Sequence, residues 1–496
     1  MSIPIREQLR RRKPIVFQQT HHQGEELARN LTTFQLMMFG VGATVGTGIF
    51  FVLSESVPEA GPAVIVSFLI AGLAAGLSAL CYAEVASAIP VSGSTYSYAY
   101  HGMGELVAVI IAGCVLLEYG VATAAVAVGW SGYFNELLHS TIGVTLPTSL
   151  STSFVSGSDG VATGGLINLP AVVLVFLCMF LLLRGATESA KVNAIMVLIK
   201  LGVLVLFVVI GLTAFDGTHF GNFFGSGIGG ITAAAGTIFF SFIGLDAVAT
   251  AGEEVKDPQR ALPRAIIGAL IIVTSVYVLV ALAGVAAKET AWFETDDAQN
   301  AGLSQILNDI TGTTIWGTVL AAGAVISIFS VTLVTLYGQT RILFAIGRDG
   351  LISRKFTEVS PRTMSPNFNT VVVSIVVAII AGFVPSDYLW DTVSIGTLVA
   401  FSVVAIGVMV LRRTHPNLER PFKIPGYPIT PILTVAACVW ILIELPMITW
   451  VIFLIWIVIV LAFYFAYSRS HATLNTYVDP EEIAEPGGRR LREDER

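Results

Sequence analysis

Glycines cluster in an apolar stretch near the start of the chain, where residues 40–50 read GVGATVGTGIF. Each glycine costs about 1 kcal/mol relative to alanine in a helix interior, so the cluster must serve some purpose. The four point to several faces of a 3.6-residue helix, and they are Gly40, Gly42, Gly46 and Gly48. We predict that the helix unwinds here, in the middle of an apolar layer, which frees backbone N–H and C=O groups to act as ligands.

Close helix packing and phosphate binding account for the glycine cluster less well. Gly42 and Gly46 have the spacing of a close helix–helix contact, but a single packing seam cannot use all four glycines. A phosphate-binding loop is also disfavoured, because no strand precedes the cluster, the spacing is not GxGxxG and no lysine follows.

A second apolar segment has a similar composition and strengthens the first prediction. Residues 233–255 read AAAGTIFFSFIGLDAVATAGEEV, with glycines at 236, 244 and 252 and an acid, Asp246, near the middle. Paired interruptions at corresponding positions of two halves are the best sequence indicator of a substrate site in a membrane carrier. No clear residue-level identity links the halves, so the repeat is inferred from placement.

The freed backbone groups suggest which ligand chemistry the two segments could serve. The N-terminal end of a half-helix carries partial positive charge and suits a carboxylate, whereas carbonyl ends suit an ammonium group. A site with both fits a zwitterionic amino acid. The expected N–H donors are Gly46, Thr47 and Gly48, and the expected carbonyl acceptors are Thr44, Val45, Phe240, Ser241 and Ile243.

Ionisable residues inside apolar segments are the next candidates. Lys200 lies in IMVLIKLGVLVLF, about ten residues or ~15 Å into its segment, which is too deep for easy snorkelling. An unpaired ammonium in hydrocarbon costs several kcal/mol, so Lys200 should face the protein interior or release its proton. We therefore expect Lys200 to carry a coupling proton.

Two acids extend this set. Glu118, in CVLLEYG, could sense the proton or a cationic substrate, or could simply be an acid satisfied by a neighbouring helix. Asp246 could bond the unwound backbone or receive a substrate side chain. Phe240 is a candidate gate over the substrate, with a lipid-facing aromatic as the alternative. Glu253 and Glu254 are expected to pair with basic residues at the inner end.

The composition determines where these residues must sit. Of 496 residues, 54% are hydrophobic and only 12% are charged, against about 25% charged in soluble domains. This composition indicates an all-α integral membrane protein. A bilayer core of ~30 Å needs about 20 apolar residues per helix. Twelve spans are expected, at 34–54, 62–88, 104–132, 169–184, 190–213, 231–252, 263–287, 314–340, 370–385, 388–411, 431–446 and 448–467.

The distribution of basic residues predicts the orientation. With both termini on one side, 25 of the 27 Lys and Arg residues fall on that side, which the positive-inside rule identifies as the cytoplasm. The exceptions are Lys288, in an outer loop, and Lys200. We therefore expect a multi-pass protein of the plasma membrane with cytoplasmic tails at 1–33 and 468–496, the latter disordered from Asn475 onward.

Other functional classes have little support in the sequence. The four cysteines are far apart, and no CxxC, Cys/His cluster, HExxH or Ser/His/Asp set occurs, so we expect no metal, no cofactor and no enzyme activity. No repeated filter sequence supports a channel. The expected partners are a small-molecule substrate, protons and the lipid bilayer, without nucleic acid. The oligomeric state is open, and a monomer is compatible.

Five motifs, in the same order along the chain, resemble the amino acid–polyamine–organocation (APC) superfamily, and most closely its bacterial cationic amino acid transporter-like permeases. They are GVGATVGTGIF (40–50), PVSGSTYSYAY (90–100), FFSFIGLDAVATAGEEVKDPQRALPRAI (239–266), YGQTRILFAIGRDGL (337–351) and RPFKIPGYPITP (420–431). One departure is Ser241 with Phe242, where relatives often have another small–aromatic pair.

The resemblance implies a LeuT-type fold, with an inverted repeat of five plus five helices at 34–213 and 231–411, two further helices at 431–467, and broken helices 1 and 6. It implies secondary active amino acid transport by alternating access, with Lys200 at the place where sodium-coupled relatives bind an ion. By position in similar permeases, Ser330 lines the substrate site, and its small size leaves room for Arg, Lys or ornithine. The open alternatives are proton symport of neutral or cationic amino acids, obligate exchange, and polyamine transport.

Overall fold

The computed structural model describes residues 5–14, 27–46, 48–154, 164–445 and 447–475. Within them the chain is helical, and each predicted span has a helical counterpart. The principal helices are α2 (Thr33–Thr44), α3 (Gly48–Ala60), α4 (Val64–Ala88), α6 (Glu105–Ile142), α8 (Leu169–Leu183), α9 (Ala186–Thr213), α10 (Gly227–Phe239), α12 (Pro258–Ala287), α14 (Ile315–Arg348), α15 (Asn367–Phe383), α16 (Ser386–Thr414), α17 (Ile429–Glu444) and α18 (Met447–Phe463).

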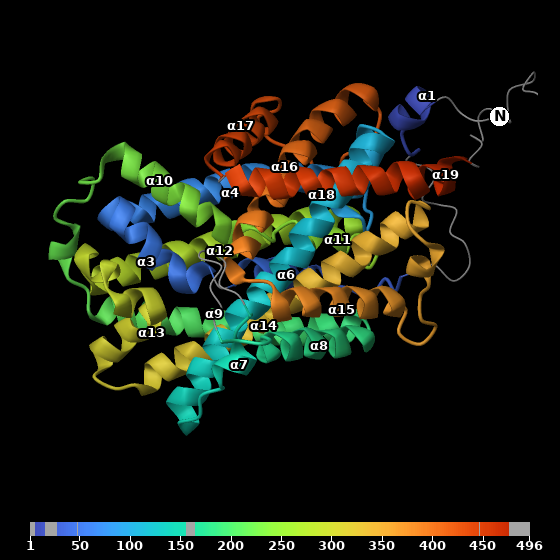
Figure 1. Ribbon diagram of the computed structural model, residues 1–496. Helices are drawn as coiled ribbons and strands as arrows, with labels where there is room; N and C mark the ends of the chain where they lie inside the picture. The colour runs from blue at the N-terminus through green and yellow to red at the C-terminus, as the bar shows by residue number, and fades with distance from the viewer. Residues whose placement is uncertain (1–4, 15–26, 47, 155–163, 446, 476–496) are drawn as a thin grey trace, which may run out of the picture.

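Shorter helices connect these elements or lie at the ends of the bundle. They are α1 (Ile5–Arg10), α5 (Ser94–Gly102), α7 (Thr148–Ser151), α11 (Ala247–Thr250), α13 (Asp296–Thr311), α19 (Arg469–His471) and the 3-10 turns η2 (Gly61–Ala63), η3 (Gly217–Phe220), η4 (Phe240–Phe242), η5 (Thr290–Glu294), η6 (Arg354–Thr357) and η8 (Thr473–Asn475), with a π turn, η7 (Tyr464–Ser468). Figure 1 shows the long helices packed into one bundle, with α1 and α19 at the same end.

Length and composition make this bundle an integral membrane protein. In the described residues, seven helical stretches are long and apolar enough to cross a bilayer, and α8, α10, α15 and most of α17 are shorter apolar helices. The most apolar stretch of α6 is 67% buried, whereas that of the stretch containing α18 is 17% buried. α6 is thus a central helix, and α18 presents most of its apolar surface outward, as a lipid-facing helix does.

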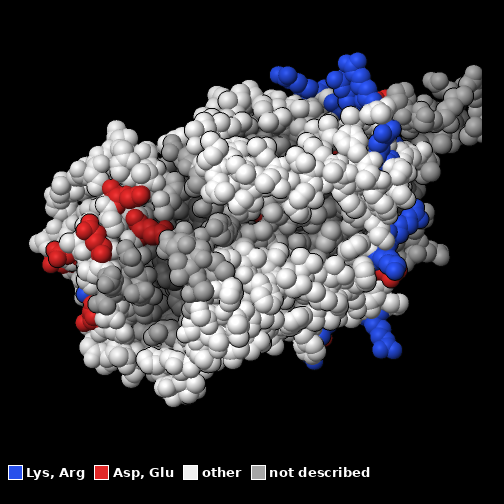
Figure 2. All heavy atoms as spheres, in the orientation of Figure 1, with Lys and Arg blue, Asp and Glu red and all other residues white. Residues whose placement is uncertain are grey.

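Charge is strongly polarised between the two ends of the bundle. Figure 2 shows Lys and Arg gathered at the end that holds α1 and α19 in Figure 1, and Asp and Glu gathered at the opposite end. We call the first the basic end. Between the two ends the visible surface is almost free of charged side chains, which is the arrangement that a hydrocarbon layer requires.

The N-terminal segment is docked on the basic end rather than detached from it. Lys13 donates to Asp349 at 2.5 Å, just after α14, and Arg11 pairs with Glu105 at the start of α6, also at 2.5 Å. Gln8 and Arg469 exchange hydrogen bonds, which joins α1 to the C-terminal segment. The disorder expected from Asn475 onward is wrong for Asn475 itself, because this residue ends η8 and accepts hydrogen bonds from Gln8 and Arg11. The residues after it lie outside those that the structure describes.

Candidate functional site

The first membrane segment is interrupted where its glycines predict. α2 ends at Thr44, and Val45 has φ −76° and ψ 86°, so the helical hydrogen bonds stop at this residue. The helix resumes as α3 at Gly48. Thr47, one of the expected N–H donors, lies outside the described residues.

The second segment is interrupted in the same way. α10 ends at Phe239, a 3-10 turn covers the next three residues, and a short α11 follows from Ala247. Gly244 lies between them with φ +109°, a conformation that strongly favours glycine. The chain therefore changes direction here without the strain that a side chain would impose.

Glycine also lets the two interruptions touch each other. A Cβ at Gly244 would lie 2.9 Å from the carbonyl oxygen of Ala43, and one at Gly48 would lie 2.6 Å from the Ser241 hydroxyl. Both approaches are too close for a side chain. The two interrupted segments therefore pack closely at these glycines, which brings residues about 200 positions apart into one site.

A pocket opens beside this contact, with a volume of about 650 Å³ that includes its mouth. Its walls come from both interruptions and from α6, α14 and α16, and most lining side chains are apolar. Within the described residues no Lys or Arg lines it. The lining residues are Ala43, Thr44, Gly46, Gly48, Glu118, Tyr119, Ala122, Val126, Ser241, Ile243, Gly244, Asp246, Ala247, Val331, Thr335 and Val393.

Two incompletely bonded carboxylates reach this pocket. Glu118 accepts a hydrogen bond from the Thr397 hydroxyl at 2.7 Å, and Asp246 accepts one from the Tyr119 hydroxyl at 2.6 Å. The other oxygen of each carboxylate, Oε2 of Glu118 and Oδ1 of Asp246, has no hydrogen-bond partner in the described part of the chain. Because both side chains are at most 3% exposed, the arrangement favours a proton or a cationic ligand group.

Several of the freed carbonyls already have partners in the protein. The Tyr277 hydroxyl, from α12, lies 3.0 Å from the carbonyl oxygens of both Thr44 and Ser241. It therefore bridges the two interruptions. Since a carbonyl has two lone pairs, those of Thr44 and Ser241 each retain capacity for a ligand.

Lys200 contacts the backbone of the first interruption and does not line the pocket. Its ammonium donates to the carbonyls of Gly42 at 2.9 Å and Val45 at 2.7 Å, and the Ser327 hydroxyl also donates to Val45, at 2.9 Å. Lys200 is fully buried, and no described carboxylate pairs with it. The Val45 carbonyl is thus engaged by α9 and α14, and Val45 does not line the pocket.

The sequence-predicted residues divide into two groups in space. Those that line the pocket are Thr44, Gly46, Gly48, Ser241, Ile243, Asp246 and Glu118. Val45, Lys200 and Ser330 do not, and the Ser330 hydroxyl donates instead to Asn193 on α9, at 2.7 Å. The gate expected at Phe240 concerns a side chain outside those that the structure describes.

Sequence reasoning missed the residues that act through hydroxyl or amide groups. Tyr119, Thr397 and Tyr277 bond the acids and the freed carbonyls, and Asn193 joins α9 to α2. Tyr119 directly follows Glu118, which could have singled it out. Nothing local distinguishes Tyr277 from other aromatic residues in apolar helices.

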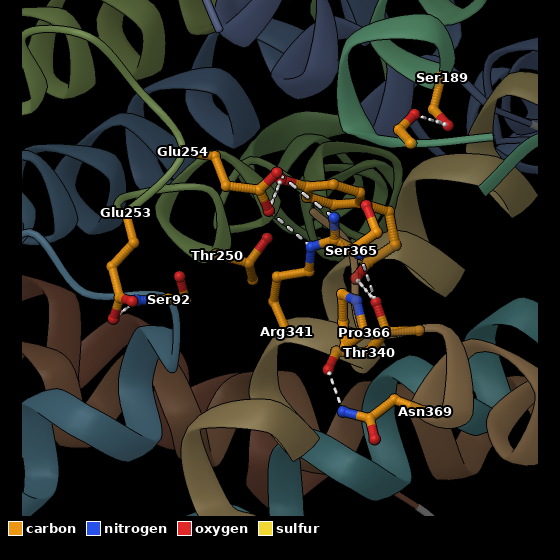
Figure 3. A network of polar contacts seen from close by, with 12 residues as sticks. Ser92, Ser189, Thr250, Glu253, Glu254, Thr340, Arg341, Ser365, Pro366 and Asn369 are labelled. Carbon is orange, nitrogen blue, oxygen red and sulfur yellow. Dashed lines mark hydrogen bonds and ion pairs between the residues drawn. The ribbon is translucent and has the colours of Figure 1, made fainter. Parts of the chain in front are cut away.

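The two acids that follow α11, Glu253 and Glu254, are both paired with arginines, and Figure 3 shows both acids. Glu254 accepts from Arg341 at 2.7 Å and from the Tyr337 hydroxyl at 2.7 Å. Glu253 pairs with Arg348 at 2.6 Å, and its carboxylate also accepts from the backbone N–H of Ser92. Both acids pair with basic residues, as the sequence predicts. These pairs tie the exit of the second interrupted segment to α14 and to the segment before α5.

No group of three or more His, Cys, Asp or Glu residues in the described chain could hold a metal ion. The pocket and the two interruptions present backbone dipoles and two carboxylates, and the Lys200 ammonium lies outside the pocket. Dipoles and charges of this kind can bind ions and polar molecules.

Comparisons with known proteins agree with this geometry. The family model described as amino acid permease matches residues 31–477. The chain is 39% identical to the methylthioribose transporter of Bacillus subtilis over 94% of its own length and 99% of the relative's. It is 41% identical to the branched-chain amino acid permease BcaP of the same organism, over 91% and 95%. The vacuolar cationic amino acid transporter 2 of Arabidopsis thaliana is 37% identical over 83% of this chain and 64% of that protein.

The family model covers most of the chain, and the two bacterial relatives match almost end to end. The family and these relatives are membrane transporters rather than enzymes. The interrupted helices, the pocket between them and these similarities lead to one conclusion: this chain belongs to the amino acid permease family of the APC superfamily.

Proposed function

We propose that this protein is a proton-coupled amino acid transporter that works by alternating access around its two interrupted helices. The observation that carries the proposal is the pocket between the interruptions, where two buried carboxylates each retain an unpartnered oxygen. An enclosed acceptor of this kind is costly without a ligand or proton, so binding is favourable there.

The proposed topology is a LeuT-type fold of twelve spans, an inverted repeat of five plus five helices followed by two more. The matched helix interruptions support the repeat. The polarised charge in Figure 2 supports a cytoplasmic basic end with both termini on that side, in the plasma membrane.

The proposed substrate pose follows from the direction of the backbone dipoles. The substrate carboxylate binds at the N-terminal end of α3, near Gly48, where N–H groups are free of helical partners. The ammonium group binds near the carbonyls of Thr44 and Ser241, which retain acceptor capacity. The substrate side chain then extends toward Glu118 and Asp246. Relatives named as branched-chain and cationic amino acid transporters support a neutral or cationic L-amino acid.

Proton coupling is proposed to act through Lys200. A charged ammonium donates to the Gly42 and Val45 carbonyls and holds the end of α2 against α9. Loss of the proton removes the charge and one donor, which weakens this contact because charge-assisted hydrogen bonds are the stronger kind. The protonation state of Lys200 then controls how firmly α2 is held.

The proposal is tested by uptake of labelled amino acids into proteoliposomes with and without an inward proton gradient. Gradient-driven accumulation of at least one neutral or cationic amino acid is expected. Lys200→Ala should abolish the gradient dependence, with Lys191→Ala, on the same helix near its start, as the control. Gradient-driven uptake by Lys200→Ala at the parent rate would refute the assigned role of Lys200.

A specific observation favours a second candidate substrate. A relative named as a methylthioribose transporter aligns over 94% of this chain. Methylthioribose has neither a carboxylate nor an ammonium group, so the backbone ends of α2 and α3 would not select it. Methylthioribose and a polyamine belong in the same uptake panel, and counterflow from preloaded vesicles distinguishes an obligate exchanger from a symporter.

A further inference from the structure

The inner half of the first interrupted segment, α2, is hydrogen-bonded to α9 at two positions along its length. The upper contact is Lys200, which donates to the carbonyls of Gly42 and Val45. The lower contact is Asn193, whose Nδ2 donates to the carbonyl of Met38 at 3.1 Å. Seven residues separate Asn193 from Lys200 along α9. That is about two helical turns or ~10 Å, so both side chains leave the same face of α9.

Asn193 joins three helices through one amide group. It is fully buried, and its Oδ1 accepts from the Ser330 hydroxyl of α14 at 2.7 Å. The carbonyl of Met38 can only accept a hydrogen bond, so the amide atom facing it must be the nitrogen. The oxygen is then left for the Ser330 hydroxyl, which donates, and the orientation of the amide is fixed by its two partners.

Gly42 provides the space for this contact. A Cβ at residue 42 would lie 2.9 Å from Oδ1 and 3.0 Å from Nδ2 of Asn193, and 3.2 Å from the Ser330 hydroxyl. A side chain at residue 42 would displace either α2 or the amide. One glycine of the sequence cluster therefore serves close packing against Asn193, while the helical hydrogen bonds stop further along, at Val45.

α2 does not stand alone at this contact, because it is tied to the second interrupted segment. Leu31 donates its N–H to the Glu254 carbonyl at 2.9 Å, and Lys256 donates its N–H back to the Leu31 carbonyl at 3.3 Å. Tyr277 bridges the upper ends of the same two segments. The contacts that hold α2 against α9 and α14 therefore also restrain the inner half of the second interrupted segment.

We propose that Asn193 is a positioning residue that holds the inner half of α2 closed at the basic end, as an uncharged contact beside the titratable one at Lys200. The inference rests on the proposed alternating access, in which α2 must leave α9 for the basic end to open. Because Asn193 carries no charge, its contribution to closure is the same at every pH, whereas that of Lys200 changes with protonation. The Ser330 hydroxyl fixes the orientation of the Asn193 amide, and the missing side chain of Gly42 leaves the space that the amide occupies.

The test measures thiol labelling of two reporter positions in the purified full-length protein in nanodiscs, where reagents reach both ends. Thr250→Cys reports opening toward the basic end, because residue 250 is buried between the pocket residue Ala247 and the Glu254 pair. Ala122→Cys reports opening of the pocket that it lines. The protein without an added cysteine measures the background from its four buried native thiols.

Asn193→Leu removes the contact to α2, Ser330→Ala removes only the hydroxyl that orients the amide, and Thr332→Val is the matched control. Thr332 is equally buried on α14, but its hydroxyl bonds only its own helix, at Ile328. We expect Asn193→Leu to raise the labelling rate at Thr250→Cys roughly threefold to tenfold over the control, which corresponds to loss of the one hydrogen bond from Asn193 to α2. Ala122 is already partly exposed in the pocket, so labelling at Ala122→Cys should rise less, whereas general loosening would raise both rates equally.

The pH dependence separates a positioning role from a titrating one. The ratio of labelling rates between Asn193→Leu and the parent should be equal at pH 6 and pH 8. Ser330→Ala, which leaves the amide in place but removes its orienting donor, should give a smaller rise in the same direction.

Labelling at Thr250→Cys within twofold of the Thr332→Val control, or equal rises at both reporters, would overturn the inference. Labelling does not require transport, so this failure is distinct from failure of the proposed function. The latter would appear as absence of gradient-driven uptake in the parent protein.

Discussion

The buried acids in the described part of the chain form two groups that differ in their partners rather than in their burial. At the basic end each acid is paired with a base, and each also accepts from a tyrosine hydroxyl or a backbone N–H. In the pocket the acids are equally buried but are bonded only by a hydroxyl. The paired acids are Glu254 with Arg341, Asp349 with Lys13, Glu105 with Arg11 and Glu84 with Arg412, and the pocket acids are Glu118 and Asp246.

The difference teaches that burial alone does not mark a binding group. A carboxylate whose oxygens are all bonded by the protein has nothing left to offer a ligand, and removing its base leaves an uncompensated charge. A buried carboxylate of a pocket-lining residue that has one unbonded oxygen can still accept a hydrogen bond from a ligand or gain a proton. The first kind is suited to holding helices together, and the second kind to recognition.

The largest expected effect comes from breaking a complete pair. Arg341→Met should destabilise the protein by about 3–5 kcal/mol, because Glu254 is left buried without its base. Methionine can keep part of the packing of Arg341 on the Tyr337 ring. The double variant Glu254→Gln/Arg341→Met should recover much of this loss in a thermal-unfolding assay. Equal losses in the single and double variants would show that the charge pair is not what matters.

Asp246→Asn should have the opposite profile, with a large effect on transport and a small one on stability. Losing the charge on the free Oδ1 removes a charge-assisted contact to the substrate, so uptake should fall about 10- to 100-fold. Thermal unfolding should change little. Tyr119→Phe, which removes the hydroxyl bonded to Oδ2, is the matched control and should cost less. Unchanged uptake in Asp246→Asn would place this acid with the structural group.

A smaller effect concerns His101, a buried group of the basic end that is bonded to the Lys13 carbonyl at 2.8 Å. Burial, together with the Lys13 charge, lowers the pKa of His101 to about 3. The unfolded chain binds a proton near pH 6.5 and the folded chain does not. Stability from this group is therefore complete above pH 6.5 and declines as the pH falls toward 3, by at most about 1.4 kcal/mol per unit.

The check on His101 is a comparison of unfolding at pH 7 and pH 5 in the parent and in His101→Gln. The parent should lose more stability than the variant between these values. A variant that loses as much as the parent would assign the acid sensitivity to other groups of the basic end.

The smallest effect is expected for an exposed pair at the opposite end of the molecule. Lys288 and Asp309 form a salt bridge at 2.6 Å with side chains 21% and 34% exposed. Lys288→Ala should change stability by less than about 1 kcal/mol, because exposed pairs gain little over hydration. A loss as large as that of Arg341→Met, measured in the same unfolding assay, would contradict the argument that burial and completeness set the cost.

The positions of both interruptions could be predicted because their cause is local. Glycine lowers helix stability wherever it occurs, and at Gly244 the positive φ is a property of that residue's own backbone. The pocket acids were conspicuous for a similar reason, since a carboxylate in an apolar segment needs a function. Glu118 and Asp246 both reach the pocket.

Partners of these groups could not be predicted, because they come from distant helices. The Val45 carbonyl was expected to face a substrate, but Lys200 and Ser327 bond it. Ser330 was expected at the site, but its hydroxyl turns to Asn193. A rotation of either helix by part of a turn would exchange these contacts, and local sequence does not specify that rotation.

The amino-acid sequence alone determined that this chain is a membrane protein, where its two helix interruptions lie and which charged residues lie in apolar segments. It could do so because hydropathy, the helix-weakening effect of glycine and the cost of a lone charge are properties of short segments. Only the tertiary structure decided which backbone carbonyls accept hydrogen bonds from Tyr277 or Lys200 and which belong to pocket-lining residues. It also decided which buried acids are paired with a base. Those outcomes depend on the register between helices far apart in the chain, where shifts of a few ångströms make or break a hydrogen bond.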